Sequence, residues 1–326
     1  MRMDDVSLIL FARSQDLVAQ MKVVFSKLPV FSSTLGHLIN PESDVLEELA
    51  SSRRCLFFVE LQSLSDQNGM DCVNEIHQRF RPMGHQLVLI VNSGTDFLDL
   101  AIHYEAGNIL FWENLEPTTV GALVRRLMGS DFFGFAPFFP NSWPVYEQQV
   151  SLTGTVNRNG LVEALFHGLL DHLDGLLRHR FLSQMSELLT NAFAYGVLGI
   201  TPEERDGHIL YIPSQITIPV GREVVVSVVC DEEKYGISVK DPGGALTLLR
   251  VLQKLRRHSL IPGRKSPLGV SDLTGRGLFI VSRQTRLVIN VLRGVQTEVI
   301  LLSYFQEERN RYQSLIINEK YPMPET

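Results

Sequence analysis

The stretch SELLTNAFAYG, residues 186–196, has the spacing of an amphipathic helix at about 100° per residue. Glu187 and Asn191 lie together on one side of this helix, because residues four positions apart are neighbours. A carboxylate beside a carboxamide favours a hydrated Mg²⁺ ion, which prefers oxygen ligands and keeps several waters. By itself, the same pattern is also that of a solvated polar face. The opposite, apolar side carries Leu182, Met185, Leu188, Leu189, Ala192 and Phe193.

A second informative segment follows a predicted hairpin. The runs EVVVSVVC (223–230) and KYGISVK (234–240) are separated by the polar residues DEE, which predicts two antiparallel strands. The second run continues directly into Asp241-Pro242-Gly243-Gly244. An aspartate at the end of a strand can accept a hydrogen bond from an exocyclic amine, and glycine lets the backbone approach a flat ring closely. Taken alone, DPGG is also an ordinary turn.

Two further segments complete a possible site. In TGRGLFIV (274–281) a pair of glycines meets the start of an apolar helix, where free amide groups favour phosphate. The run QTEVIL (296–301) predicts a closing strand, on which the hydroxyl of Thr297 could support the Asp241 carboxylate.

In this order, the four segments resemble the GHKL ATPase superfamily, which includes histidine kinases, gyrase, Hsp90 and MutL. The resemblance covers residues 147–305 and is greatest to the anti-sigma-factor serine kinases, in which the domain begins with a strand and two helices. Here we expect the strand at 148–154, one helix over 161–177 and a second from about Phe181. The resemblance implies a Bergerat-fold α/β sandwich that binds ATP and Mg²⁺.

The resemblance also implies a role for each matching position. Glu187 would be the general base or would orient a water, and Asn191 would be the Mg²⁺ ligand. Asp241 would bind the adenine amine, Gly243 would allow the close approach and Thr297 would assist through water. Residues 246–274 would form the lid over the nucleotide. The positions expected around the phosphates are Gly275, Arg276 and Gly277, with Arg264 or Lys265 reaching the γ-phosphate.

This sequence departs from the family pattern at two places. The usual Asp-x-Gly-x-Gly is Asp-Pro-Gly-Gly-Ala here, and Tyr195 stands where a histidine is often found. These departures favour ATP binding over fast phosphotransfer. We also considered His167, His172 and His179 as phosphoacceptors, but none lies in the sequence setting of such a site, so we interpret them as surface histidines.

The N-terminal residues 1–130 predict an α/β domain with a parallel sheet, because short apolar runs alternate with amphipathic helices. The expected second strand, at about 31–39, is less distinct. The pattern resembles a response-regulator receiver domain. The other apolar runs are VSLILFA (6–12), CLFFVEL (55–61), QLVLIV (86–91) and NILFW (108–112).

The residues that a working receiver needs are replaced. The third strand ends in Glu60 instead of a phosphoacceptor aspartate, and the first runs into Ala12-Arg13 instead of an acidic pair. The fourth and fifth strands run into Asn92-Ser93 and Glu113-Asn114. Without the acidic pair there is no magnesium site. We therefore predict a pseudo-receiver used for docking or dimerisation; an unrelated flavodoxin-like domain is the alternative.

The segments outside the two predicted domains differ in character. The linker, residues 131–146, is rich in proline and aromatic residues, so we expect it to pack between the domains or against a second subunit. The tail, residues 306–326, is polar and we expect it to be partly disordered.

Composition excludes several classes of protein. Thirty basic and 36 acidic residues give a net charge of −6 without a basic run, which argues against nucleic-acid binding. No apolar run is long enough to span a bilayer and the first residues lack a signal-peptide pattern, so we predict a cytoplasmic protein. Cys55, Cys72 and Cys230 predict neither a disulfide framework nor a zinc site.

The combined prediction is a bacterial signalling regulator. Its ATP-binding domain would phosphorylate a serine or threonine of a small antagonist protein, or sequester a sigma-factor-like partner. The alternative is a non-catalytic adaptor that acts through protein contacts, and a homodimer is compatible with either. A third hypothesis, an autophosphorylating histidine kinase, lacks an identifiable phosphoacceptor.

Overall fold

The structure is a computed structural model that describes residues 6–28, 54–64, 67–80, 84–128, 132–139, 145–201, 212–260, 266–271, 276–311 and 313–322. The chain is of the α/β class. It divides into two compact units: the first comprises residues 1–140 and 314–316, and the second comprises residues 141–313 and 317–326. The strands of the first unit are mainly parallel and those of the second are antiparallel.

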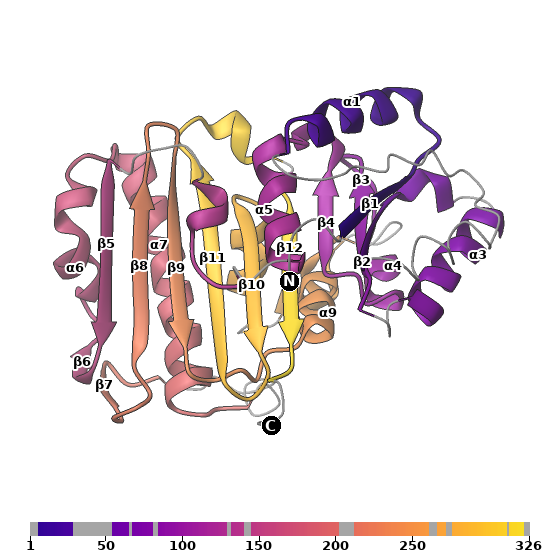
Figure 1. Cartoon of the computed structure of the whole chain (residues 1–326). Coiled ribbons are helices and arrows are strands. Elements are labelled where there is room, and N and C mark those ends of the chain that lie inside the picture. Colours follow the sequence, from indigo (N-terminus) through magenta and orange to yellow (C-terminus); the bar gives the residue numbers. More distant parts are fainter. Residues whose placement is uncertain are drawn as a thin grey trace. The chain divides into compact units, whose positions relative to one another are not determined.

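The first unit is a parallel sheet in the order β1-β2-β3-β4, with helices between successive strands (Figure 1). The strands lie where the sequence predicts them, since their continuous apolar runs are buried. Ser14 begins the first helix, where its Oγ accepts a hydrogen bond from Leu17 N–H at 3.2 Å. The expected strand at 31–39 lies outside the described residues. The elements are β1 (Val6–Phe11), α1 (Gln15–Ser26), β2 (Arg54–Glu60), η2 (Leu61–Leu64), α3 (Gln67–Glu75), η3 (Ile76–Phe80), β3 (Gln86–Val91), α4 (Leu98–His103), β4 (Asn108–Phe111), η5 (Trp112–Asn114), α5 (Pro117–Met128) and η6 (Ala136–Phe138).

The described part of the aromatic linker packs against α5. The buried Arg126 side chain donates hydrogen bonds to the carbonyl oxygens of Phe132, at 2.6 Å, and Gly134, and its guanidinium lies 4.8 Å from the centre of the Phe138 ring. The guanidinium thus provides hydrogen bonds for backbone carbonyl groups that lie among apolar side chains. Residues 132–139 belong to the first unit, and the predicted domain boundary at residue 130 stays a prediction.

The second unit is built on an antiparallel sheet in which β10-β11-β9-β8-β5 are successive neighbours. Figure 1 shows α7 running along the strands of this sheet, and α7 contacts β9. Two short strands, β6 and β7, form a separate antiparallel pair. The elements are β5 (Tyr146–Leu152), β6 (Gly154–Asn157), α6 (Leu161–Leu170), α7 (Gly175–Asn191), η7 (Ala192–Val197), β7 (Gln215–Ile218), β8 (Val224–Cys230), β9 (Lys234–Asp241), α9 (Leu248–His258), η8 (Leu268–Ser271), α10 (Arg276–Ser282), β10 (Arg286–Leu292), β11 (Gln296–Tyr304) and η9 (Glu307–Asn310).

Two predictions for this unit need correction. The second helix begins at Gly175 and not near Phe181, because the Asp174 side chain accepts a hydrogen bond from Leu177 N–H at 2.8 Å and caps it. The tail, expected to be partly disordered, contains the ordered strand β12 (Leu315–Lys320), whose first half is deeply buried. Leu315 and Ile316 pair with β4, while the rest of β12 belongs to the second unit beside β10.

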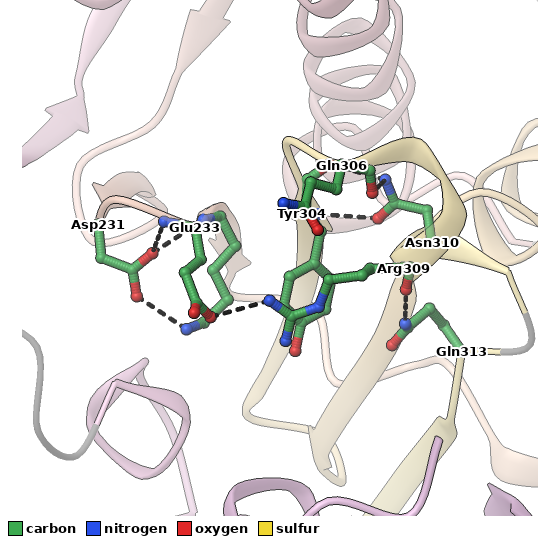
Figure 2. A network of polar contacts seen from close by, with 8 residues as sticks. Asp231, Glu233, Tyr304, Gln306, Arg309, Asn310 and Gln313 are labelled. Carbon is green, nitrogen blue, oxygen red and sulfur yellow. Dashed lines mark hydrogen bonds and ion pairs between the residues drawn. The ribbon is translucent and has the colours of Figure 1, made fainter. Parts of the chain in front are cut away.

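A polar network holds the turn that follows β11 (Figure 2). The side chain of Asn310, 4% exposed, accepts a hydrogen bond from Tyr304 N–H at 2.8 Å and donates one to Tyr304 O at 2.7 Å. Arg309 lies over the Tyr304 ring at 4.0 Å and pairs with Glu233 at 3.0 Å. The ion pair joins the β8–β9 turn to the segment after β11. The Asn310 side chain takes the place of a neighbouring strand as hydrogen-bond partner of the Tyr304 backbone.

We predict that Asn310→Ala lowers the free energy of unfolding by about 1–3 kcal/mol, because it leaves both the N–H and the C=O of Tyr304 without this partner in a buried place. Chemical denaturation of the variant measures this loss. Arg309→Ala, at a more exposed position, should cost less; an equal or larger loss for Arg309→Ala would contradict the assignment.

Candidate functional site

One cavity of the second unit brings together five of the residues expected to form the site. Its volume is about 700 Å³, including space open to solvent. Pockets for small molecules and cofactors typically combine apolar walls with a few polar groups, as this cavity does. The lining residues are Glu187, Leu188, Asn191, Ala192, Tyr195, Val239, Asp241, Gly243, Ala245, Leu246, Lys254, Leu278, Thr297 and Val299.

Asp241 lies at the end of β9 directly opposite Thr297 of β11. Its Oδ1 accepts a hydrogen bond from Gly243 N–H at 2.8 Å, and the carboxylate is only 7% exposed. The Thr297 hydroxyl accepts a hydrogen bond from Gly244 N–H at 3.1 Å. Thr297 thus holds the turn after β9 in place.

The last turn of the α7–η7 helix closes on Asp241. A Cβ added to Gly196 would lie 2.5 Å from both Cβ and Oδ1 of Asp241, so any larger residue at this position would displace the carboxylate or the helix. Gly196, the last residue of the stretch SELLTNAFAYG, is therefore required because it packs against Asp241, which lies in another sequence segment.

Burial raises the pKa of Asp241 to about 7, while the Gly243 N–H and the positive charge of Arg222 act in the opposite direction. The carboxyl group can therefore exist in both protonation states near neutral pH. In its ionised form it accepts hydrogen bonds only, which suits a ligand that presents an N–H group.

Glu187 and Asn191 face the same cavity from α7. Asn191 Nδ2 donates a hydrogen bond to Glu187 Oε1 at 3.0 Å. Two oxygen-bearing side chains of this kind fit Mg²⁺, which takes few ligands from a protein when phosphates supply others. Within the described residues, however, no cluster of three or more histidine, cysteine or acidic side chains is arranged to hold a metal.

The first turn of α10 lies against Glu187. A Cβ added to Gly277 would lie 1.9 Å from Cδ of Glu187, so this glycine also permits a close approach. Arg276, the first residue of α10, is exposed and does not line the cavity. Gly275, Arg264 and Lys265 lie outside the described residues, so their predicted contacts stay predictions.

The predicted lid region contains a regular helix, α9, which begins after Thr247. Leu248, Val251, Leu252 and Leu255 are buried while Leu249 is exposed, and Lys254 lines the cavity. Sequence reasoning missed Lys254, although the repeat of apolar residues in LLRVLQKLRRH is a helical signal that could have revealed it. It also missed Arg222, which lies in a short turn without a recognisable motif.

The first unit places Glu60 in a structural role. Its carboxylate, 3% exposed, accepts hydrogen bonds from the N–H groups of Arg13, at 2.7 Å, and Ser14, at 3.2 Å. At the position where a receiver would carry its phosphoacceptor, the side chain therefore fixes the loop that leads from β1 into α1.

The remaining candidate residues of the described chain lie outside the cavity. His167, His172 and His179 are exposed. Cys55 and Cys230 are buried free thiols whose pKa burial raises to about 11, which keeps them protonated and unreactive. In the described part of the chain, no helix combines the length and the hydrophobicity needed to cross a lipid bilayer.

Comparison of the sequence with models of known protein families finds no match, and a search of curated proteins finds no significant relative.

We predict that Asp241→Asn stabilises the protein above neutral pH. The unfolded aspartate ionises near pH 3.8 and the folded one near 7, so the free energy of unfolding of the wild type falls as the pH rises between these values. Asparagine does not ionise, and its Oδ1 can still accept from Gly243. The variant should therefore exceed the wild type by about 2–4 kcal/mol at pH 8, with the difference shrinking towards pH 4. Urea denaturation across this pH range measures it, and a difference independent of pH would contradict the burial of a titrating carboxylate.

Proposed function

We propose that the second unit binds ATP and Mg²⁺ in the cavity lined by Glu187, Asn191, Asp241, Gly243 and Thr297. The observation that carries this proposal is the convergence of these side chains, which come from three sequence segments, around one partly open space. An antiparallel sheet with helices packed on it also agrees with the Bergerat fold that the sequence pattern implies.

Each residue has a role that follows from its chemistry. The ionised Asp241 carboxylate binds an exocyclic ring amine, while the apolar side chains of Val239, Leu246 and Val299 surround the ring. Bound nucleotide and Mg²⁺ would supply a transferable phosphoryl group whose charge the metal offsets. Asn191 would hold the metal, and Lys254 would contribute positive charge from α9.

The reaction that fits this arrangement is phosphorylation of a serine or threonine hydroxyl on a partner protein. Glu187 lies beside the proposed metal ligand and would accept the hydroxyl proton, as a general base within hydrogen-bond reach does. The partner would be a small antagonist protein or a sigma-factor-like protein, and the chain would act in a cytoplasmic signalling pathway.

We propose a non-catalytic adaptor as the second candidate. The first unit favours it, since Glu60 is committed to two backbone contacts and the acidic pair of a receiver is absent from the sequence. On this hypothesis, the first unit is a degenerate receiver-like domain that docks a partner or a second copy, and the nucleotide sets a conformation without being consumed.

Calorimetric titration with a non-hydrolysable ATP analogue and Mg²⁺ tests nucleotide binding. We expect the wild type to bind and Asn191→Ala to lose roughly tenfold in affinity, since one ligand of the metal is removed. Ser186→Ala is the matched control, because Ser186 is exposed on the same helix and does not line the cavity. No binding by the wild type would refute the nucleotide site.

Incubation with labelled ATP and candidate antagonist proteins separates the kinase from the adaptor. A kinase transfers acid-stable label to the partner, and Glu187→Gln should reduce the rate by about 10²–10⁴-fold if Glu187 is the general base. Nucleotide binding without transfer to any of the partner proteins would favour the adaptor, whereas acid-labile label on the chain itself would indicate a histidine kinase.

A further inference from the structure

Arg222 connects a surface turn to the wall of the cavity. It lies between β7 and β8, and its Nη2 donates a hydrogen bond to the carbonyl oxygen of Gly196 at 2.6 Å. Gly196 is the residue whose Cα packs directly against the Asp241 carboxylate. The guanidinium is thus attached to the backbone segment that touches Asp241.

The charge of Arg222 also acts on Asp241. It lowers the pKa of the carboxyl group and so opposes the effect of burial. The Gly243 N–H acts in the same direction through its hydrogen bond. The other charged or titratable side chains that face this space are Glu187 from α7, Tyr195 from η7 and Lys254 from α9.

The hydrogen bond of Arg222 to Gly196 and the charge of Arg222 both act on Asp241, which lines the cavity. A carboxylate accepts a hydrogen bond from a ring amine only when it is ionised, and it accepts with good geometry only when its neighbours hold it in place. The Arg222 guanidinium provides both conditions. Its charge favours the ionised Asp241, and its hydrogen bond to Gly196 O fixes the backbone beside this carboxylate.

We propose that Arg222 is a positioning residue for Asp241: it fixes the backbone at Gly196, against which the carboxylate that binds the purine amine packs. The charge of Arg222 acts in support, because it favours the ionised form of this carboxylate. This inference rests on the proposed function, since it assigns Arg222 to the same nucleotide site. A purely structural role for Arg222, as an anchor for the β7–β8 turn, is the alternative that the experiment must separate.

The test compares Arg222→Gln with Arg222→Lys and uses Arg178→Gln as the matched control. Arg178 is a surface arginine of α7 whose nearest acidic partner, Glu163, is 3.9 Å away, and it does not line the cavity. Affinity for the Mg²⁺ complex of a non-hydrolysable ATP analogue is measured from about pH 6 to about pH 9. Since the ligand is the same throughout, its own titration cancels when variants are compared.

We expect Arg222→Gln to move the pH midpoint of binding upward by about one unit and to weaken binding near pH 7 by roughly fivefold, with recovery at high pH. Arg222→Lys keeps the charge and should retain a midpoint close to that of the wild type, and Arg178→Gln should change neither quantity. Loss of affinity by the same factor at every pH would overturn the proposal and leave Arg222 as a turn anchor.

A second measurement separates this inference from the proposed function. Carbon-13 NMR follows the carboxyl group of Asp241 during a pH titration of the protein without ligand. An upward shift of its midpoint in Arg222→Gln supports the coupling even if the wild type binds no nucleotide, in which case the proposed function fails. An unchanged midpoint in a variant that binds nucleotide normally would refute the positioning role.

Discussion

The candidate site of the second unit is organised around a carboxylate that is buried at the end of a strand. Removing Asp241 from water is unfavourable, and the Gly243 N–H and the charge of Arg222 offset only part of that cost. The antiparallel register that places Thr297 opposite Asp241 adds a hydroxyl that secures the next turn. With these contacts in place, the Asp241 carboxylate faces a cavity that its neighbouring side chains do not fill.

The same constraint explains why glycine occurs where it does in this site. Gly196 touches Asp241 and Gly277 touches Glu187, so each of the two acidic side chains of the cavity has a glycine pressed against it. A larger residue at either position would displace the acidic side chain that lines the cavity. The two glycines therefore act on the site through packing, Gly196 between the η7 helix and β9 and Gly277 between α10 and α7.

Much of this arrangement could be predicted from the sequence, because it rests on local patterns. QLVLIV is a strand at exactly its predicted bounds, and the pairing of Glu187 with Asn191 follows from helical spacing alone. Convergence of Asp241 and Thr297 could be expected only from the resemblance to a family, since their sequence separation conceals that they lie on adjacent strands. The missed features are non-local or weakly signalled. Gly175 is a poor helix former at the start of α7, and β12 is short, with three apolar residues followed by three polar ones, and owes its order to the strands beside it.

Strand β12 also constrains the order in which the chain can fold during synthesis. Residues 314–316 belong to the first unit, where Leu315 and Ile316 pair with β4. Nearly the whole second unit, residues 141–313, is synthesised after residue 140 and before these residues. Until these residues leave the ribosome, β4 has an unpaired edge of the kind that recruits strands from other molecules. Completion of the N-terminal unit therefore has to wait until nearly the whole second unit has been synthesised, and a fragment ending at residue 140 would carry that open edge permanently.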